Sequence, residues 1–300
     1  MRIEKGIKTP KSSSVFEDEG DMVNVRSQCG PIDSTSLFKY TPASLLKPGQ
    51  LEAKLFNNLY TQTSFYNRER IETKDSQKKT WYTANLQLLY GLNEKVNVGM
   101  AFNFKSVVIN GLSDSPLDAL QFENDDNSRA VLASLGPQIK FIPIKKIKNL
   151  SVLSTLYIPV ASDLESHPFV QHQSVDWYTQ VFYDLVLEEH VRLFFEIDAL
   201  YEIDTYDVLG ESEFGTPVKA FATYYYNQSF ALYGMAEWSQ KYGDSAFGTL
   251  FHQWHVQAGV GGKLQLSPLF ELELLYTNFV AGKNAGAGET FNIGLRFLRQ

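Results

Sequence analysis

The feature that most constrains this chain is an alternation of apolar and polar side chains, with a period of two residues, that begins at Leu51 and continues to Leu298. In residues 82–90, Tyr, Ala and Leu alternate with Thr, Asn and Gln over most of the stretch. In residues 191–203, the Arg, Glu and Asp side chains all fall on one of the two faces. A helix would spread these charges around its circumference, whereas a strand separates them. The pattern predicts an all-β fold.

The same alternation recurs in about twelve segments. Most are longer than the ~5–6 residues usual in soluble proteins and close to the ~9–11 needed for a tilted strand to cross a bilayer. The predicted strands cover residues 51–66, 80–91, 95–108, 129–143, 149–161, 175–188, 190–204, 216–227, 229–241, 250–266, 269–281 and 289–298.

The links between these segments alternate in length. The short links are residues 91–94, 144–148, 189, 228 and 267–268, and the long ones are 67–79, 109–128, 162–174, 205–215, 241–249 and 282–289. Long loops at one end of an antiparallel meander and short turns at the other are typical of outer-membrane barrels. A sandwich with Greek-key crossovers would not keep this order. We therefore expect a closed up-and-down antiparallel transmembrane β-barrel whose first and last strands pair.

Residues 51–300 resemble a bacterial outer-membrane β-barrel of the uncharacterised, transporter-like, porin-like type found in Bacteroidota. The hairpin 88–99 is similar to hairpins of such barrels, and residues 291–300 resemble their carboxy-terminal assembly signal, although Arg299 stands where an apolar residue is expected. The resemblance implies a Gram-negative outer-membrane location and contact with outer-membrane lipid. It is architectural, and implies no particular solute and no catalytic residue.

Composition excludes several other classes of protein. No stretch approaches 18 consecutive apolar residues, as a transmembrane helix would require. The net charge of −7 and the isoelectric point near 5.3 argue against a nucleic-acid partner. The single cysteine, Cys29, excludes an internal disulfide and an all-cysteine metal site. No motif implies a cofactor.

Residues 1–50 lack the alternation and contain an acidic patch at 17–21, so we expect a flexible N-terminal segment that precedes the barrel at 51–300. No apolar run near Met1 has the length of a secretory signal. Either the chain is not exported, or its start lies upstream, or a signal was removed. Cys29 follows Arg26, Ser27 and Gln28, which lack the small apolar residues of a lipoprotein site.

The alternation also predicts which side chains face lipid and which face the barrel interior. Leu86, Met100, Phe195, Val256 and Leu272 are expected to point outward, and aromatic residues including Trp81 and Phe279 to form a belt at the outer rim. The candidate lumen-lining residues are Asp184, Arg192, Glu196, Asp198, Glu202, Asp204, Lys219, Glu237, Lys263, Glu271 and Glu273.

Together with Glu52, Asp176, Lys54, Lys105, Lys140 and Arg296, these residues give the predicted interior ten acids and seven bases. This excess predicts a mild preference for cations in a water-filled lumen. A salt-bridged filling without a transport role is the alternative. Inward-facing Phe and Tyr residues predict that the lumen is narrow.

One pair of residues has the spacing of a catalytic site. His172 and Ser174 lie on one strand face with the spacing of a general base and a nucleophile, which resembles the His-x-Ser of outer-membrane phospholipases. The expected Asn-Gly-Arg after the serine is absent, and no asparagine occurs between Ser174 and Asn227 to orient the histidine. His252 and His255 fall on opposite strand faces, which disfavours joint metal binding.

Three functions follow from the sequence. The first is a narrow, non-enzymatic channel or binding barrel for a small solute or cation. The second is a structural or accessory barrel whose long outer loops contact protein partners. The third, least favoured, is a membrane lipid hydrolase acting through His172 and Ser174. The solute, the oligomeric state and the role of residues 1–50 are not encoded in any of these patterns.

Overall fold

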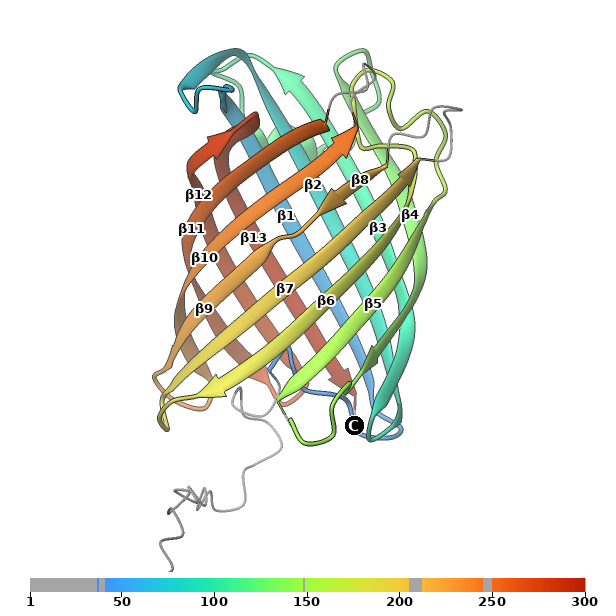
Figure 1. Cartoon of the computed structure of the whole chain (residues 1–300), viewed down its shortest axis with the longest axis vertical. Helices are drawn as coiled ribbons and strands as arrows, with labels where there is room; N and C mark the ends of the chain where they lie inside the picture. The colour runs from blue at the N-terminus through green and yellow to red at the C-terminus, as the bar shows by residue number, and fades with distance from the viewer. Residues whose placement is uncertain (1–36, 38–40, 148, 205–211, 245–249, 300) are drawn as a thin grey trace, which may run out of the picture. The chain divides into compact units, whose positions relative to one another are not determined.

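The computed structural model describes residue 37 and residues 41–147, 149–204, 212–244 and 250–299. The predicted N-terminal residues 1–36 and 38–40, Cys29 among them, lie outside the described residues. In the described part, a single antiparallel sheet closes on itself, because β1 pairs with both β2 and β13 and β10 pairs with β11 (Figure 1). The strands are β1 (Leu51–Tyr66), β2 (Glu72–Asn93), β3 (Val96–Asn110), β4 (Ser128–Phe141), β5 (Leu150–Pro159), β6 (Ser174–Val186), β7 (Val191–Asp204), β8 (Glu213–Gly215), β9 (Val218–Tyr225), β10 (Phe230–Asp244), β11 (Leu250–Ser267), β12 (Phe270–Lys283) and β13 (Ala285–Arg299).

Strands β8 and β9 are two parts of one barrel strand, since both pair with β7 and both pair with β10. The interruption falls at Thr216 and Pro217, where the proline has no N–H to donate to the ladder. The wall remains bonded there, because the Asp198 N–H donates to the Pro217 carbonyl at 2.8 Å and the Thr216 N–H to the Gln240 carbonyl at 2.9 Å. The described chain therefore forms a closed barrel of twelve strands, which confirms the predicted fold.

Two of the predicted long links are much shorter in the structure. Strand β2 begins at Glu72, so only residues 67–71 separate it from β1. Strands β12 and β13 are separated by Asn284 alone, which adopts a φ of 51°. Residues predicted as loop extend the strands here: Tyr66 of β1 pairs with Glu72 of β2, whereas residues 281–283 pair with β11 and residues 285–288 pair with β1. This pairing satisfies their backbone groups in water as well as in lipid. We call the end with residues 67–71, 111–127 and 160–173 the loop end, and the opposite end the short-turn end.

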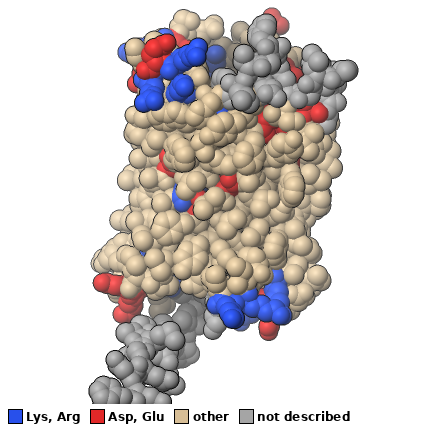
Figure 2. Space-filling view, in the orientation of Figure 1, with Lys and Arg blue, Asp and Glu red and all other residues tan. Residues whose placement is uncertain are grey.

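The outer surface of the barrel is apolar between its ends. Charged side chains gather mainly at the two ends of the face in Figure 2. Met100 and Phe195 are exposed on the outside, as predicted. Leu86 and Leu272 alternate with residues that line the interior and therefore also point outward. Because a charge on a lipid-facing surface costs about 2–4 kcal/mol near the bilayer midplane, this surface suits lipid contact.

Residues 41–50, which we call the inner segment, pack inside the barrel at its short-turn end. Ala43 is buried with Leu153, Phe182 and Phe194, and Leu46 is buried with Leu89 and Leu298. The sequence placed these ten residues with the N-terminal segment because they show no alternation. Their contacts instead place them with the barrel, where they fill space that the strands leave open.

Residues 160–173, which we call the inserted loop, occupy the interior near the loop end. Leu164 is 0% exposed and Val170 4% exposed, and both contact Val107 and Ala133. The inner segment and the inserted loop therefore each occupy part of the lumen, near opposite ends of the barrel.

Helical structure plays little part in the described chain. A 3-10 helix, η1 (Pro116–Leu120), lies in the loop between β3 and β4, and the Ser115 side chain caps it by accepting a hydrogen bond from the Leu117 N–H. Among the residues that the structure describes, no helix has the length and apolar character needed to cross a membrane.

Candidate functional site

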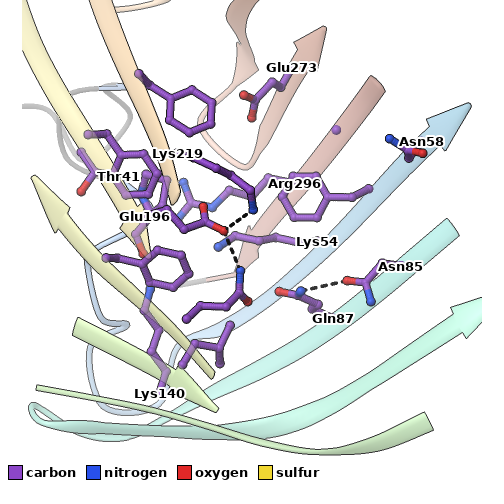
Figure 3. Close-up of a pocket in the computed structure, with 18 of the residues that line it drawn as sticks. Thr41, Lys54, Asn58, Asn85, Gln87, Lys140, Glu196, Lys219, Glu273 and Arg296 are labelled. Atoms are coloured by element: carbon purple, nitrogen blue, oxygen red, sulfur yellow. Dashed lines mark hydrogen bonds and ion pairs between the residues drawn. The ribbon is translucent and has the colours of Figure 1, made fainter. Parts of the chain in front are cut away.

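A cavity of about 680 Å³ lies inside the barrel and reaches Thr41 and Pro42 of the inner segment (Figure 3). Because side chains alternate along each strand, every second residue of the wall points into it. Seven of the eleven sequence-predicted candidates line this cavity: Asp184, Arg192, Glu196, Lys219, Lys263, Glu271 and Glu273.

The other four candidates lie outside the cavity lining. Asp198 is 1% exposed and pairs with Lys219. Glu202 pairs with Lys241, and a Glu237 oxygen lies 3.7 Å from His255 Nε2. Asp204 is half-buried at the end of β7. The alternation thus predicted facing direction but not depth along the barrel.

Lys219 is the centre of a charged cluster on the wall formed by β6, β7 and β9. Its ammonium lies 2.7 Å from Glu196 Oε1 and 2.9 Å from Asp198 Oδ2. The Tyr178 hydroxyl donates to Asp198 Oδ2 at 2.6 Å, and the Gln180 amide donates to Glu196 Oε1 at 2.9 Å. The strand register places Glu196 directly beside Lys219, so opposite charges meet across the ladder.

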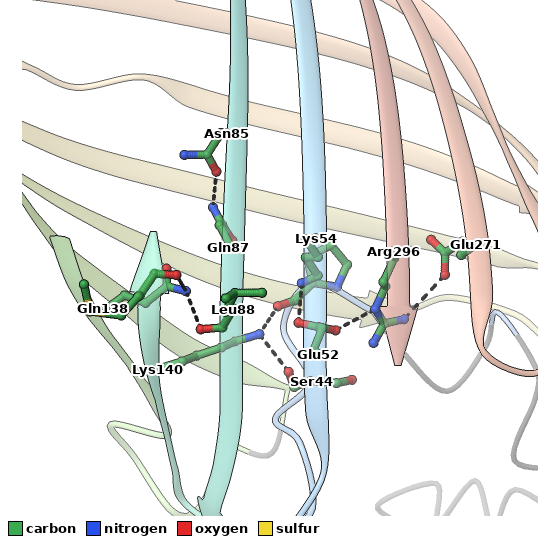
Figure 4. A network of polar contacts seen from close by, with 12 residues as sticks. Ser44, Glu52, Lys54, Asn85, Gln87, Leu88, Gln138, Lys140, Glu271 and Arg296 are labelled. Carbon is green, nitrogen blue, oxygen red and sulfur yellow. Dashed lines mark hydrogen bonds and ion pairs between the residues drawn. The ribbon is translucent and has the colours of Figure 1, made fainter. Parts of the chain in front are cut away.

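A second charged cluster joins β1, β12 and β13 near the short-turn end (Figure 4). Glu52 accepts from Lys54 at 3.0 Å and from the Arg296 Nε at 2.6 Å, and Arg296 also lies 3.4 Å from Glu271. Glu52 is only 3% exposed, so its two cationic partners offset the cost of burying its charge.

Lys140 on β4 holds the inner segment. Its ammonium donates to the Pro42 carbonyl at 2.5 Å and to the Ser44 carbonyl at 2.7 Å, and Figure 4 shows the side chain extended toward Ser44. The Thr41 hydroxyl donates to Asp184 on β6. Lys140 therefore binds backbone in the structure and does not pair with the acids of β7.

Uncharged amides form the wall of β2 and β3. The Asn85 amide donates to Asn103 Oδ1 at 2.6 Å and to the Tyr157 hydroxyl at 3.0 Å, and Gln87 donates to Asn85 Oδ1 at 2.8 Å. These residues line the cavity with Asn58 and Thr83. They are uncharged and so were not among the predicted site residues, although their inward positions follow from the same alternation.

Aromatic rings line the opposite wall. Ring centroids are 5.9 Å apart between Phe182 and Phe194, 5.4 Å between Phe194 and Phe221, and 5.9 Å between Phe221 and Tyr233. These four residues belong to β6, β7, β9 and β10, and all of them line the cavity. The row confirms the predicted aromatic bulk in the lumen.

Trp81 and Phe279 were predicted to join the outer aromatic belt, but both contact residues on the inside of the barrel. Tyr60 stacks on Trp81 at 5.6 Å and lies 5.3 Å from Phe279, and the Trp81 indole donates to the Phe169 carbonyl of the inserted loop. On β12 the register skips Val280, so the alternation changes phase beyond it. A bulge of this kind leaves no mark in a period-two pattern.

The charge balance of the cavity differs from that of the predicted interior. Among the described residues that line it, seven are basic and five are acidic. Glu52, Asp198, Glu202, Asp204 and Glu237, all predicted to face the interior, lie outside the lining. Lys241, a base not among the predicted interior residues, pairs with Glu202 at 2.6 Å and also with Glu213. Three acids of β7 thus pair with lysines: Glu196 and Asp198 with Lys219 of β9, and Glu202 with Lys241 of β10.

His172 and Ser174, the candidates for a hydrolase site, contact other residues and not each other. His172 Nδ1 lies 3.2 Å from Glu165, and its Nε2 lies 3.7 Å from Glu213. Ser174 is 3% exposed and donates its hydroxyl to Asp176. The serine hydroxyl therefore donates its hydrogen bond to a carboxylate and not to His172, so the two residues do not form a base–nucleophile pair.

His252 and His255, the pair weighed as metal ligands, also have separate surroundings. His252 stacks on Tyr242 with 4.6 Å between centroids, whereas His255 lies against Phe279 at 4.8 Å. Within the described residues, no group of three or more His, Cys, Asp or Glu side chains is placed to hold a metal ion.

No protein-family model and no curated protein sequence matches this chain. Solved structures do resemble it. An outer membrane channel from Pseudomonas putida F1 superposes with a TM-score of 0.64 and 15% identity over 87% of this chain and 98% of the channel. The β domain of the Bordetella autotransporter BrkA gives a TM-score of 0.52 and 11% identity over 84% of this chain and 99% of that domain. The chain therefore has the fold of the bacterial outer-membrane β-barrels.

Proposed function

We propose that this protein is a narrow outer-membrane channel or binding barrel for a small solute. The observation that carries the proposal is the combination of an apolar outer surface with a polar interior that encloses a cavity of about 680 Å³. The outer surface is suited to lipid, and the interior is suited to water and solute. The short-turn end would face the periplasm and the loop end the exterior, as in other barrels of this build.

A pair of adjacent substitutions on β2 tests the membrane location. Leu86 points outward and Gln87 points into the cavity. Leu86→Arg should impair folding into lipid vesicles by about 2–4 kcal/mol, because it places a charge on the lipid-facing surface. Gln87→Arg should be tolerated. Equal effects of the two substitutions would contradict a lipid-facing outer wall.

Conductance tests the channel. The purified protein reconstituted in planar bilayers should give small, discrete current steps, because the inner segment and the inserted loop narrow the lumen. The absence of conductance in protein that has folded correctly would favour the binding barrel or the accessory barrel over the channel.

A mild cation preference is the finer part of the proposal. It is supported by Glu202 and Glu213 toward the loop end, two carboxylates that share the ammonium of Lys241. The cavity lining opposes it, with seven bases against five acids among the described residues. Reversal potentials under a salt gradient decide between the two, and anion selectivity would overturn the cation preference.

An accessory role is the second candidate, supported by exposed apolar side chains on the loop between β3 and β4. Leu112 is 53% exposed and Leu117 58% exposed. Phe122 of the same loop packs against the outward-facing rings of Tyr82 and Phe104, so this loop also adjoins the lipid-facing surface. Copurification of a stoichiometric partner that is lost on Leu117→Ser would favour this role.

A further inference from the structure

The cavity is lined by uncharged polar and aromatic side chains as well as by charged ones, and these uncharged groups indicate the kind of solute that fits it. Three observations bear on this: how the lining charges are paired, what the amides leave unpaired, and where an apolar ring is exposed inside the barrel. They build on the proposed function, because they concern the solute of that same cavity.

Of the twelve charged residues that line the cavity in the described chain, seven are in ion pairs, six of them with one another and Lys54 with Glu52. Glu196 binds Lys219, Lys263 lies 3.3 Å from Glu273, and Arg296 lies 3.4 Å from Glu271. A charged solute would have to compete with these pairs or leave one partner unpaired, which is costly in a partly buried site. The walls therefore favour a solute without net charge.

The side-chain amides and hydroxyls of the cavity wall can both donate and accept hydrogen bonds. Within the described residues, Asn58 Oδ1, Gln87 Oε1 and Gln180 Oε1 accept no hydrogen bond from the protein, whereas the NH₂ group of each amide donates to a neighbour at 2.7 to 2.9 Å. The three amides are thus oriented with their oxygens available. Thr83 and Thr223 add hydroxyls that donate and accept. A solute rich in hydroxyl groups matches such a lining, since each hydroxyl is both donor and acceptor.

Phe56 supplies an apolar surface inside the barrel. It lines the cavity and is 41% exposed, which is unusual for a large apolar side chain on a polar interior face. Gly294 lies directly across the strand pair, and a Cβ there would come within 3.3 Å of the Phe56 ring. The glycine leaves room for the ring, whose exposed part offers a flat surface for the C–H groups of a saturated ring.

We infer that the cavity takes a neutral polyhydroxylated solute of the size of a mono- or disaccharide. The amides of β1, β2 and β6 bond its hydroxyls, and Phe56 contacts its less polar face. The volume of about 680 Å³ lies within the range of small-molecule sites, about 300–1,000 Å³.

The test compares solutes that share a ring and differ in charge. Glucose, sucrose, glucosamine and glucuronate are added to the full-length protein in planar bilayers, and the fall in ion current is measured against solute concentration. We expect saturable block by glucose or sucrose at lower concentrations than by the two charged sugars. Tighter block by glucosamine or glucuronate, or current that no sugar reduces, would overturn the inference and leave the channel standing.

Substitutions of cavity residues test whether the sugar that blocks the current binds at the proposed site. Gln87→Leu should raise the half-blocking concentration by roughly 3- to 10-fold, as expected for the loss of one neutral hydrogen bond. Phe56→Ala should also raise it. Gln77→Leu is the matched control, because Gln77 is exposed on the same strand and lies outside the cavity lining. An equal shift in Gln77→Leu would contradict the proposed site.

A second measurement separates this inference from the proposed function. If the protein does not conduct, titration calorimetry of the detergent-solubilised protein with the same four sugars still tests binding. Binding of glucose or sucrose without conductance would support the solute class and reject the channel. No binding and no conductance would reject both.

Discussion

At each end of the lumen, a basic side chain of β4 donates hydrogen bonds to backbone carbonyls, but the two side chains differ in their exposure to solvent. At the short-turn end, Lys140 of β4 donates to the carbonyls of Pro42 and Ser44 in the inner segment. At the loop end, Arg129 of the same strand donates to the Ser162 carbonyl at 2.7 Å and to the Asp163 carbonyl in the inserted loop. In each case a cation on β4 satisfies backbone carbonyls of a segment that enters the barrel.

The surroundings of the two cations differ. Lys140 is 3% exposed, whereas the bonds of Arg129 are open to solvent. Water can replace an exposed donor at little cost, but a buried carbonyl that loses its donor stays unpaired. The inner segment should therefore be the firmer of the two obstructions and the inserted loop the one that opens first.

The largest expected effect comes from Gly91, where the inner segment passes closest to the wall. The Gly91 N–H donates to the Gln50 carbonyl at 2.9 Å, and a Cβ at this position would lie 2.0 Å from the Lys47 carbonyl oxygen. Overpacking of this kind costs about 1–3 kcal/mol. Gly91→Ala should shift the ratio of seated to displaced inner segment by roughly 5- to 150-fold, and single-channel conductance should rise.

Gly234→Ala is the control for that substitution, because the nearest atom to a Cβ at Gly234, the Gly259 carbonyl oxygen, would be 4.0 Å away. Both variants add one methyl group to a barrel glycine. If their conductances match, the inner segment does not limit the current, and the comparison of the two ends loses its basis.

Lys140→Met should have the next largest effect. Methionine keeps much of the length of the side chain but leaves the Pro42 and Ser44 carbonyls without their donor, at a cost of about 1–3 kcal/mol. Hydrogen exchange of residues 41–50 in the reconstituted protein should accelerate. Lys145→Met, at an exposed turn position, should leave it unchanged. Unchanged exchange in both variants would show that Lys140 does not hold the segment.

Arg129→Met should have a smaller effect, because the bonds it removes are exposed. A cost of roughly 0.5–1.5 kcal/mol is expected, with faster hydrogen exchange confined to residues 160–173. Arg68→Met, on an exposed hairpin residue at the same end, is the control. An effect larger than that of Lys140→Met would reverse the order of the two ends.

The barrel was predictable from the sequence because every outward-facing side chain of its wall has to be compatible with lipid. An outward side chain faces lipid, so apolar residues recur at every second place and the strand count follows. The sequence-based predictions are wrong where the alternation between lipid-facing and inward-facing residues is interrupted. Around Asn284 the predicted loop is instead strand, because residues 281–283 pair with β11 and residues 285–288 pair with β1, and at Val280 a bulge changes the facing direction without altering composition.

The site was predictable in part, for a related reason. The alternation predicts that Glu196 and Lys219 face inward, but which inward residues meet depends on register and depth, which no local pattern encodes. The inner segment was missed because it shows no alternation and because two of its contacts with the wall are made through its backbone: Lys140 binds two carbonyls, and Gly91 bonds the Gln50 carbonyl and leaves room for Lys47. Neither contact requires a recognisable residue within residues 41–50.

The smallest expected effect concerns ion selectivity at the loop end. Lys241 lies 2.6 Å from Glu202 and also pairs with Glu213, and its side chain is 23% exposed, so solvent weakens both pairs. Lys241→Met removes one positive charge and leaves two acids near the solute path, so the reversal potential should move toward cation selectivity. The shift should diminish between about 0.1 and 1 M salt, because the screening length falls from ~10 to ~3 Å. Lys95→Met, at an exposed turn of the opposite end, removes the same charge away from the interior. If it moves the reversal potential as far as Lys241→Met does, selectivity arises from net charge and not from the acids at the loop end.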